Sequence, residues 1–198
     1  MDSTSQDAVK RIKIYGHVSA TPEQLAQILG GEVSSQVDED ADIAIFAINP
    51  AAGIDAATIE LWQGFDELQT PRMVVVTVLE GMDLDFDDAV LVANRVFYSL
   101  VTPYLVLHGD SGTPIGTISL TDLSTIDYST VPPTQGVADD ELRELVKDFQ
   151  EEYAVHIMEM EDGAFAAGIL FPAIPINPAN GLGLEIIKQY LDQLPGRS

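Results

Sequence analysis

The chain has 198 residues, of which 9 are basic and 32 acidic, giving a formal net charge of −23 at pH 7, and it contains no cysteine. This charge disfavours direct binding of nucleic acid, free nucleotides and anionic membranes, and the lack of cysteine excludes disulfides, thiolate metal sites and cysteine nucleophiles. Because no apolar stretch is long enough to span a bilayer and the start lacks a signal-peptide core, we expect a cytoplasmic protein without membrane contact.

The first half of the chain alternates between short apolar runs and amphipathic segments. Residues 12–15, 43–48 and 73–79 are almost continuously apolar, as central parallel strands buried on both faces tend to be. Residues 32–37 read as a short strand, and helices are predicted over 22–29, 58–68 and 85–101. This β-α-β alternation predicts an α/β fold with a three-layer, doubly wound and mostly parallel sheet.

The pattern changes after residue 102. Residues 104–107 and 115–120 predict an antiparallel hairpin, 128–136 a linker and 138–153 an acidic helix. The α/β pattern resumes with an expected last strand over 166–171 and ends in a helix near 184–194. We therefore expect an α/β core over 1–102 and 164–198, with 1–9 disordered, and an inserted α+β subdomain over 103–163.

The most informative segment lies between the first strand and the first helix, where a nucleotide-binding P-loop would read G-x-x-x-x-G-K-[ST]. Gly16 fits the first glycine, but Thr21, Pro22 and Glu23 stand where the second glycine, the lysine and the hydroxyl residue are needed. Pro22 has no N–H to offer, and Glu23 places negative charge where phosphate oxygens would lie. The same residues make a good helix start, with Thr21 as N-cap, Pro22 at the first helical position and Gln24 three residues after the cap.

The order of elements resembles the GTP-binding domain of the translation elongation factor G family, including that family's inserted subdomain. The likeness is carried by residues 14–25, similar to G-H-V-D-A-G-K-T-T-L, by 41–54, similar to A-D-x-A-x-x-V-V-D-A-x-x-G-V, and by 71–76, similar to P-R-I-x-F-V. Residues 115–123 resemble F-x-G-V-x-D-L of the insert, and 183–195 resemble the closing helix. The resemblance implies a P-loop-GTPase-like fold and, in an intact family member, GTP binding and hydrolysis.

Each nucleotide-contacting element that the resemblance implies is altered here. The base-reading N-K-x-D falls on residues 77–80, where Thr77 replaces the asparagine and Glu80 keeps a carboxylate, and the last guanine contact falls near Asn177. The segment between residues 31 and 41 is too short for the magnesium-binding and water-orienting loops. His17, His108 and His156 lack metal spacing. We therefore predict a degenerate G domain, a pseudo-GTPase without catalytic residues, cofactor or metal.

Two roles stay open for such a protein. The first is a protein-interaction or regulatory module, with a basic protein as the favoured partner and homodimerisation through a sheet edge that the missing strands leave open. The second is residual binding of a nucleotide or small anion near Gly16, His17, Asn49 and Glu80, although Asn49 also fits a simple Asn-Pro turn. This second role needs a nearby cation, and the candidates in sequence are Lys10, Arg11, Lys13 and Arg72.

Overall fold

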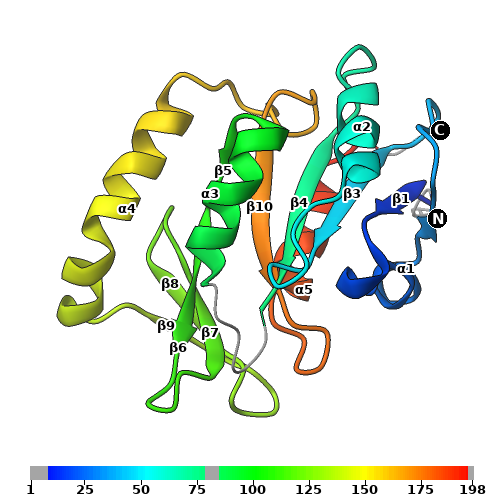
Figure 1. Cartoon of the computed structure of the whole chain (residues 1–198). Coiled ribbons are helices and arrows are strands. Elements are labelled where there is room, and N and C mark those ends of the chain that lie inside the picture. Colours follow the sequence, from blue (N-terminus) through cyan, green and yellow to red (C-terminus); the bar gives the residue numbers. More distant parts are fainter. Residues whose placement is uncertain (1–8, 79–84, 196–198) are drawn as a thin grey trace, which may run out of the picture.

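The computed structural model describes residues 9–78 and 85–195, which form two sheets and the helices around them (Figure 1). The larger sheet has six strands in the order β2-β1-β3-β4-β10-β5, and every neighbouring pair in it is parallel. The smaller sheet has four antiparallel strands in the order β6-β7-β8-β9. No helix in these described ranges is both long and apolar enough to cross a membrane.

Helices cover both faces of the larger sheet, which is why its central strands are buried at every residue. Its strands are β1 (Ile12–Tyr15), β2 (Glu32–Val33), β3 (Ile43–Ile48), β4 (Arg72–Thr77), β5 (Leu100–Val101) and β10 (Phe171–Ile176). One face packs against α1 (Pro22–Leu29) and α5 (Leu184–Asp192), and the other against α2 (Ala56–Gly64) and α3 (Phe86–Phe97). The expected three-layer, doubly wound arrangement is confirmed.

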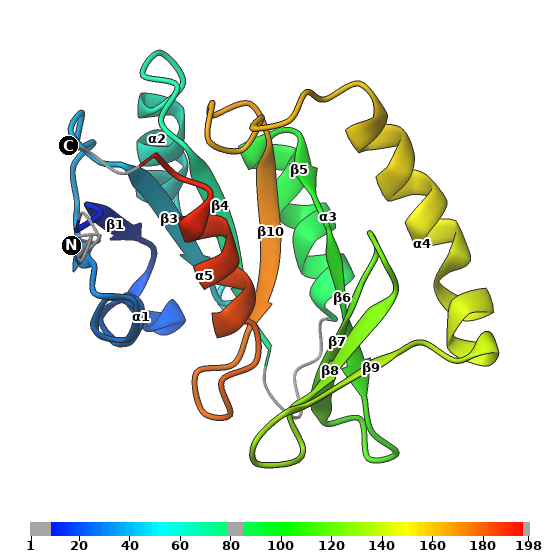
Figure 2. The same cartoon turned by 180° about the vertical axis from the view of Figure 1, so that it is seen from behind.

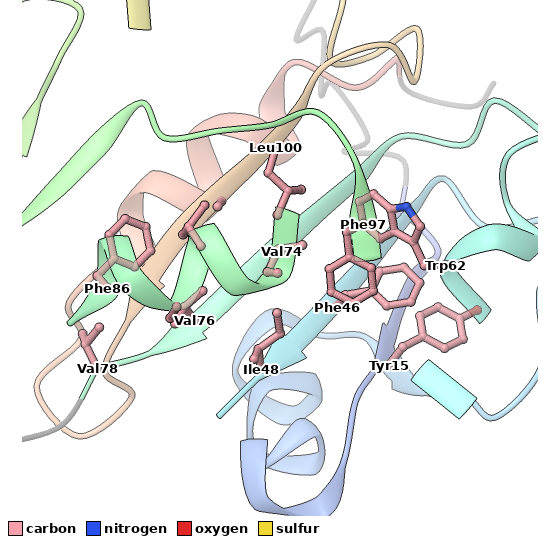
Figure 3. Packing of buried hydrophobic residues seen from close by; sticks show 14 of the residues in the cluster. Tyr15, Phe46, Ile48, Trp62, Val74, Val76, Val78, Phe86, Phe97 and Leu100 are labelled. Carbon is pink, nitrogen blue, oxygen red and sulfur yellow. The ribbon is translucent and has the colours of Figure 1, made fainter. Parts of the chain in front are cut away.

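Aromatic rings dominate the core between the sheet and the layer formed by α2 and α3 (Figure 3). The ring of Phe46 on β3 lies 5.0 Å, centroid to centroid, from both Tyr15 on β1 and Trp62 on α2. Phe97, the last residue of α3, lies 4.7 Å from Trp62. These stacked, edge-to-face and tilted contacts join strands and helices that are distant in sequence into one packed layer.

The smaller sheet comprises β6 (Tyr104–His108), β7 (Pro114–Ser119), β8 (Ser124–Asp127) and β9 (Thr134–Val137), and the long helix α4 (Asp140–Met158) follows it. A separate apolar cluster, which includes Ile118 and Leu120 from the sheet side and Val146 from α4, joins helix to sheet. Seen from behind, α4 lies outermost, on the far side of this sheet from the body of the larger one (Figure 2). The domain boundaries at 103 and 163 stay a prediction.

Several expected segments are wrong in detail. The helix expected over 58–68 is Ala56–Gly64, the strand expected over 32–37 is Glu32–Val33, and the helix expected over 138–153 is Asp140–Met158. The last strand is Phe171–Ile176 rather than 166–171, and part of the expected linker over 128–136 is strand β9. The helix expected over 85–101 ends at Phe97 because Tyr98 and Ser99 adopt positive φ angles of 47° and 52°, after which the chain continues as β5.

The expected open edge also lies elsewhere. Strand β1 is not the edge of the larger sheet, because Glu32 and Val33 of β2 pair with it in parallel. The edge on this side is therefore β2, a strand of two exposed residues, and β5 forms the opposite edge.

Candidate functional site

Parallel strands place their carboxyl ends at one edge of a sheet, and in doubly wound folds this edge holds the ligand. Gly16 follows β1, Asn49 follows β3, Thr77 ends β4 and Asn177 follows β10. Since these four strands are consecutive in the sheet, the structure brings the predicted positions together along that edge. Glu80 lies outside the described residues.

Gly16 has a structural reason to be glycine. Its φ angle is +143°, a region that is open almost only to glycine, and a Cβ placed there would lie 2.4 Å from the carbonyl oxygen of Ala47 on β3. The close approach of the loop to the neighbouring strand therefore accounts for this residue without a phosphate.

The loop after Gly16 is closed by its own hydrogen bonds. It forms a short 3-10 turn, Val18–Ala20, which His17 caps by accepting from the Ser19 backbone N–H at Nδ1 (3.2 Å). The N–H of Ala20 donates to the carbonyl of His17 (2.9 Å), and that of Thr21 donates to the carbonyl of Val18 (3.0 Å). A P-loop needs such amides to point at phosphate oxygens. Here three consecutive amides already have acceptors inside the loop.

Thr21 is the N-cap of α1 by position but not by side chain. Its backbone is left-handed, with φ 51° and ψ 48°, and its hydroxyl makes no capping hydrogen bond, so the expected side-chain cap is wrong. The carbonyl of Thr21 instead accepts from the N–H groups of Gln24 (3.1 Å) and Leu25 (3.2 Å). Pro22 is buried at the first helical position as expected, and Glu23 is exposed in the first turn of the helix.

Asn49 fastens the loop to the end of β3. Its Nδ2 donates to the carbonyl of Ser19 (2.9 Å), while its Oδ1 accepts from the N–H of Ala51 (3.0 Å) in the turn after the strand. The turn expected from the Asn-Pro sequence is therefore present. The contact to Ser19 was not expected, because the two residues are thirty positions apart and no local pattern connects them.

The remaining two positions are also engaged in the fold. Thr77 is buried at the end of β4, opposite Ile176 of β10. The N–H of Asn177 donates to the carbonyl of Leu182 (3.0 Å), and its Oδ1 accepts from the N–H of Ala179 (3.0 Å). The loop from Asn177 to Leu182 therefore closes on itself much as the loop after β1 does.

Arg72, one of four cations near the site in sequence, lies far from it in the fold. It begins β4 and so stands at the opposite edge of the sheet. Its Nη1 donates to the carbonyl of Trp62 and to Oδ1 of Asp66, both at 2.7 Å. Its guanidinium lies 4.6 Å from the centre of the Trp62 ring and 4.5 Å from that of Phe171, a buried cation–π sandwich that is part of the core.

The other three cations also have partners away from the loop. Lys13 contacts Glu32 (2.7 Å) and Asp38 (3.1 Å), and hydrogen bonds to these two carboxylates raise the pKa of Lys13. Arg11 pairs with Asp40 at 3.5 Å, and Lys10 donates to the carbonyl of Leu191. None of the four therefore supplies the positive charge that a triphosphate needs at the carboxyl edge. In residues 9–78 and 85–195 no group of three or more His, Asp or Glu side chains is placed to hold a metal ion.

Comparisons with known proteins show similarity in sequence and in fold. No protein-family model matches the sequence. Two curated relatives, both named elongation factor G-like protein, come from Mycobacterium tuberculosis strains CDC 1551 / Oshkosh and ATCC 25618 / H37Rv. Each is 28% identical over 171 residues, covering 75% of this chain and 24% of the relative. The chain thus spans about a quarter of the length of these relatives.

A solved structure of a protein from Thermus thermophilus superposes with a TM-score of 0.74 over 96% of this chain and 41% of its own, at 18% identity. At that identity the likeness shows the fold alone, an α/β fold with a mostly parallel six-stranded sheet. Together with the curated relatives it supports the resemblance drawn from the sequence: three quarters of the chain is similar in sequence to proteins named elongation factor G-like protein.

Proposed function

We propose that this protein is a pseudo-GTPase, a G-domain-like fold that neither hydrolyses nor binds GTP and acts by binding another protein. The observation that carries the proposal is the closed loop after β1, in which the amides of Ser19, Ala20 and Thr21 donate within the loop. To hold phosphates, this loop would have to break three hydrogen bonds that the fold already makes.

The charges near this loop support the same proposal. Phosphoryl transfer depends on positioning and on neutralising the charge of the transferred group. At the start of α1 the exposed carboxylate of Glu23 is the charged group, and Pro22 stands in place of a lysine. Both replacements act against a bound triphosphate, whose binding the helix dipole would otherwise favour.

Isothermal titration with GTP and with GDP, each with and without Mg²⁺, tests the proposal directly. We expect no saturable heat at millimolar nucleotide, while circular dichroism of the same sample shows a folded α/β protein. Micromolar affinity for either nucleotide would overturn the proposal.

The alternative, residual binding of a small anion, is favoured by one observation: four of the predicted positions do meet at the carboxyl edge of the sheet. It is disfavoured by the engagement of the four candidate cations elsewhere. Titration with inorganic phosphate separates the two, because the alternative requires saturable binding that is lost in the Asn49→Ala variant.

A net charge of −23 supports a basic protein as the partner, since opposite charge speeds encounter and like charge resists it. We further propose that the protein acts in the cytoplasm, which the absence of cysteine supports. Homodimerisation through a sheet edge stays a prediction, and light scattering tests it. Because the edge strand β2 has two residues, we expect such a dimer to be weak.

A further inference from the structure

A groove with a cavity volume of about 230 Å³ runs between α3 and α4, far from the loop after β1. Its walls are formed by Leu91 and Asn94 from α3 and by Phe149 and His156 from α4, and the short strand β5 contributes to its floor. Figures 1 and 2 show α4 at the outer side of the molecule, next to α3 and the smaller sheet.

The walls of the groove expose large apolar side chains. Leu91 is 63% exposed and Phe149 is 42% exposed, although both are large hydrophobic residues. Leu145 is 73% exposed and precedes Phe149 by one turn, so it continues the same flank of α4. Exposed apolar side chains gathered at one groove typically mark an interaction site.

Carboxylates lie in and beside the groove, next to these apolar residues. Asp87 and Glu152 line the groove itself, one from each helix. Glu141 and Glu159 are separated from Glu152 by nearly whole numbers of helical turns, so the three form one acidic line beside the apolar flank of α4. Burial, together with the neighbouring Asp85 and Asp88, raises the pKa of Asp87, which indicates that acidic groups are crowded at this end of α3.

Basic residues are few on these two helices. On α4, Arg143 and Lys147 lie on the flank turned away from the groove, by the same helical spacing, and the side chain of Arg143 donates to the carbonyl of Ala138. On α3 the cation is Arg95, one turn beyond Leu91. The groove therefore combines an apolar centre with a mainly acidic rim.

We propose that this groove receives an amphipathic helix of a partner protein, with apolar residues at i, i+3, i+4 and i+7 on one face and lysine or arginine along its borders. Such a helix matches both the apolar centre and the acidic rim. Helices that bind in grooves use apolar anchor residues at these spacings. A second copy of this chain matches poorly, because each copy carries the charge of −23. The inference rests on the proposed function, because it assigns the proposed protein-binding role to this groove.

The probe is a fluorescein-labelled peptide of about 15 residues, Leu at the four apolar positions and Lys elsewhere, long enough to form helix on binding. Fluorescence anisotropy at low salt measures its affinity for the full chain. We expect Leu145→Ala and Phe149→Ala each to weaken binding by about tenfold, the loss typical of central apolar anchors. Glu152→Gln should weaken it by a few-fold and make binding less dependent on salt.

Val155→Ala is the matched control. Val155 is nearly as exposed as Leu145, at 68% against 73%, but by helical spacing it lies about 120° around α4 from Phe149, beyond the acidic line. The affinity of the Val155→Ala variant for the peptide should stay within about twofold of that of the unmodified protein. A peptide of the same composition with its leucines scattered around the helix should bind about tenfold more weakly.

Three outcomes would overturn the inference: equal loss in the control and the groove variants, equal binding of the scattered peptide, or amide NMR shifts that avoid α3 and α4. Self-association that Phe149→Ala abolishes would assign the groove to a second copy instead. Because nucleotide titration reports on the loop after β1 and peptide titration on this groove, either proposal can fail without the other.

Discussion

Thr21 holds a backbone conformation suited to the glycine that it replaces. A β-branched residue at φ 51° and ψ 48° is strained by about 1 kcal/mol or more, and its exposed side chain makes no capping bond in return. We expect Thr21→Gly to raise the free energy of unfolding by about 0.5 kcal/mol, since the relief of strain exceeds the entropy that glycine adds to the unfolded chain. Urea denaturation measures the change.

Ala20→Gly is the control for this substitution, because Ala20 belongs to the 3-10 turn and needs no left-handed backbone. The Ala20→Gly substitution should lower the free energy of unfolding by about 1 kcal/mol. If both glycine variants lose stability equally, the strain assigned to Thr21 is wrong.

Gly16 presents the opposite case, a glycine that cannot be replaced. We expect Gly16→Ala to lower the free energy of unfolding by about 3 kcal/mol, from backbone strain together with the clash of the new Cβ with the Ala47 carbonyl. Gly53→Ala is the control, because Gly53 also has a positive φ, +72°, but nothing within 4 Å of its Cβ position. It should cost only about 1 kcal/mol in the same urea titration. Equal losses would remove the clash from the explanation.

At the scale of elements, a single side chain joins the loop after β1 to the turn after β3. We expect Asn49→Ala to lower the free energy of unfolding by about 2 kcal/mol, because it removes the bonds to Ser19 and to Ala51 together. Asn49→Asp keeps an acceptor for the Ala51 N–H but presents a carboxylate to the Ser19 carbonyl. Asn49→Asp should therefore lower the stability at least as much as Asn49→Ala, which thermal unfolding measures. A smaller loss would assign the stabilisation to the turn alone.

The elements that the sequence predicted well are those whose burial follows a simple period. Strands β1, β3 and β4 and helix α1 were expected within two residues of their observed bounds because they are uniformly apolar or plainly amphipathic. The prediction placed strand β10 too early in the sequence, because prolines such as Pro172 and Pro175 are not expected in a central strand. The structure resolves the conflict: β5 pairs only with Phe171 and Pro172, so Pro175 has no strand beside it on that side.

For the site, sequence comparison predicted the position of the loop and the loss of its nucleotide-binding residues, but not the reason that the loop is closed. That reason lies in backbone bonds between near neighbours and in the long-range contact from Asn49 to Ser19, both of which depend on φ and ψ angles. The groove between α3 and α4 was missed because the helical period of α4 does not reveal which of its apolar side chains stay exposed, as Phe149 does at 42%.

At the scale of the whole molecule, an excess of acid makes stability depend on pH in a way that differs between carboxylates. Burial and neighbouring acids raise the pKa of Asp87 above its usual 3.8. The folded state therefore holds this proton more tightly than the unfolded state, and stability is lost as the pH rises from 3.8 through the folded pKa. We expect Asp87→Asn to escape this loss, so that its advantage over the unmodified protein in urea titrations grows across that range.

Asp38 should behave with the opposite sign. A hydrogen bond from Lys13 lowers the pKa of Asp38 below 3.8, so its carboxylate stabilises the fold above that pH, and the effect disappears as the pH falls through the folded pKa. Asp38→Asn should be the less stable protein at neutral pH and should match the unmodified protein in strong acid. Parallel slopes for the two variants would contradict both assignments.

The single tryptophan of the chain, Trp62, is 1% exposed and lies against the Arg72 guanidinium and three aromatic rings. An indole so enclosed emits at short wavelength, and its emission moves to the red once water reaches it. Because the ring joins α2, α3, β3 and β10, its emission reports on the integrity of the sheet and its helices together. The molecule thus carries its own optical probe, and every unfolding experiment proposed above can be followed without a label.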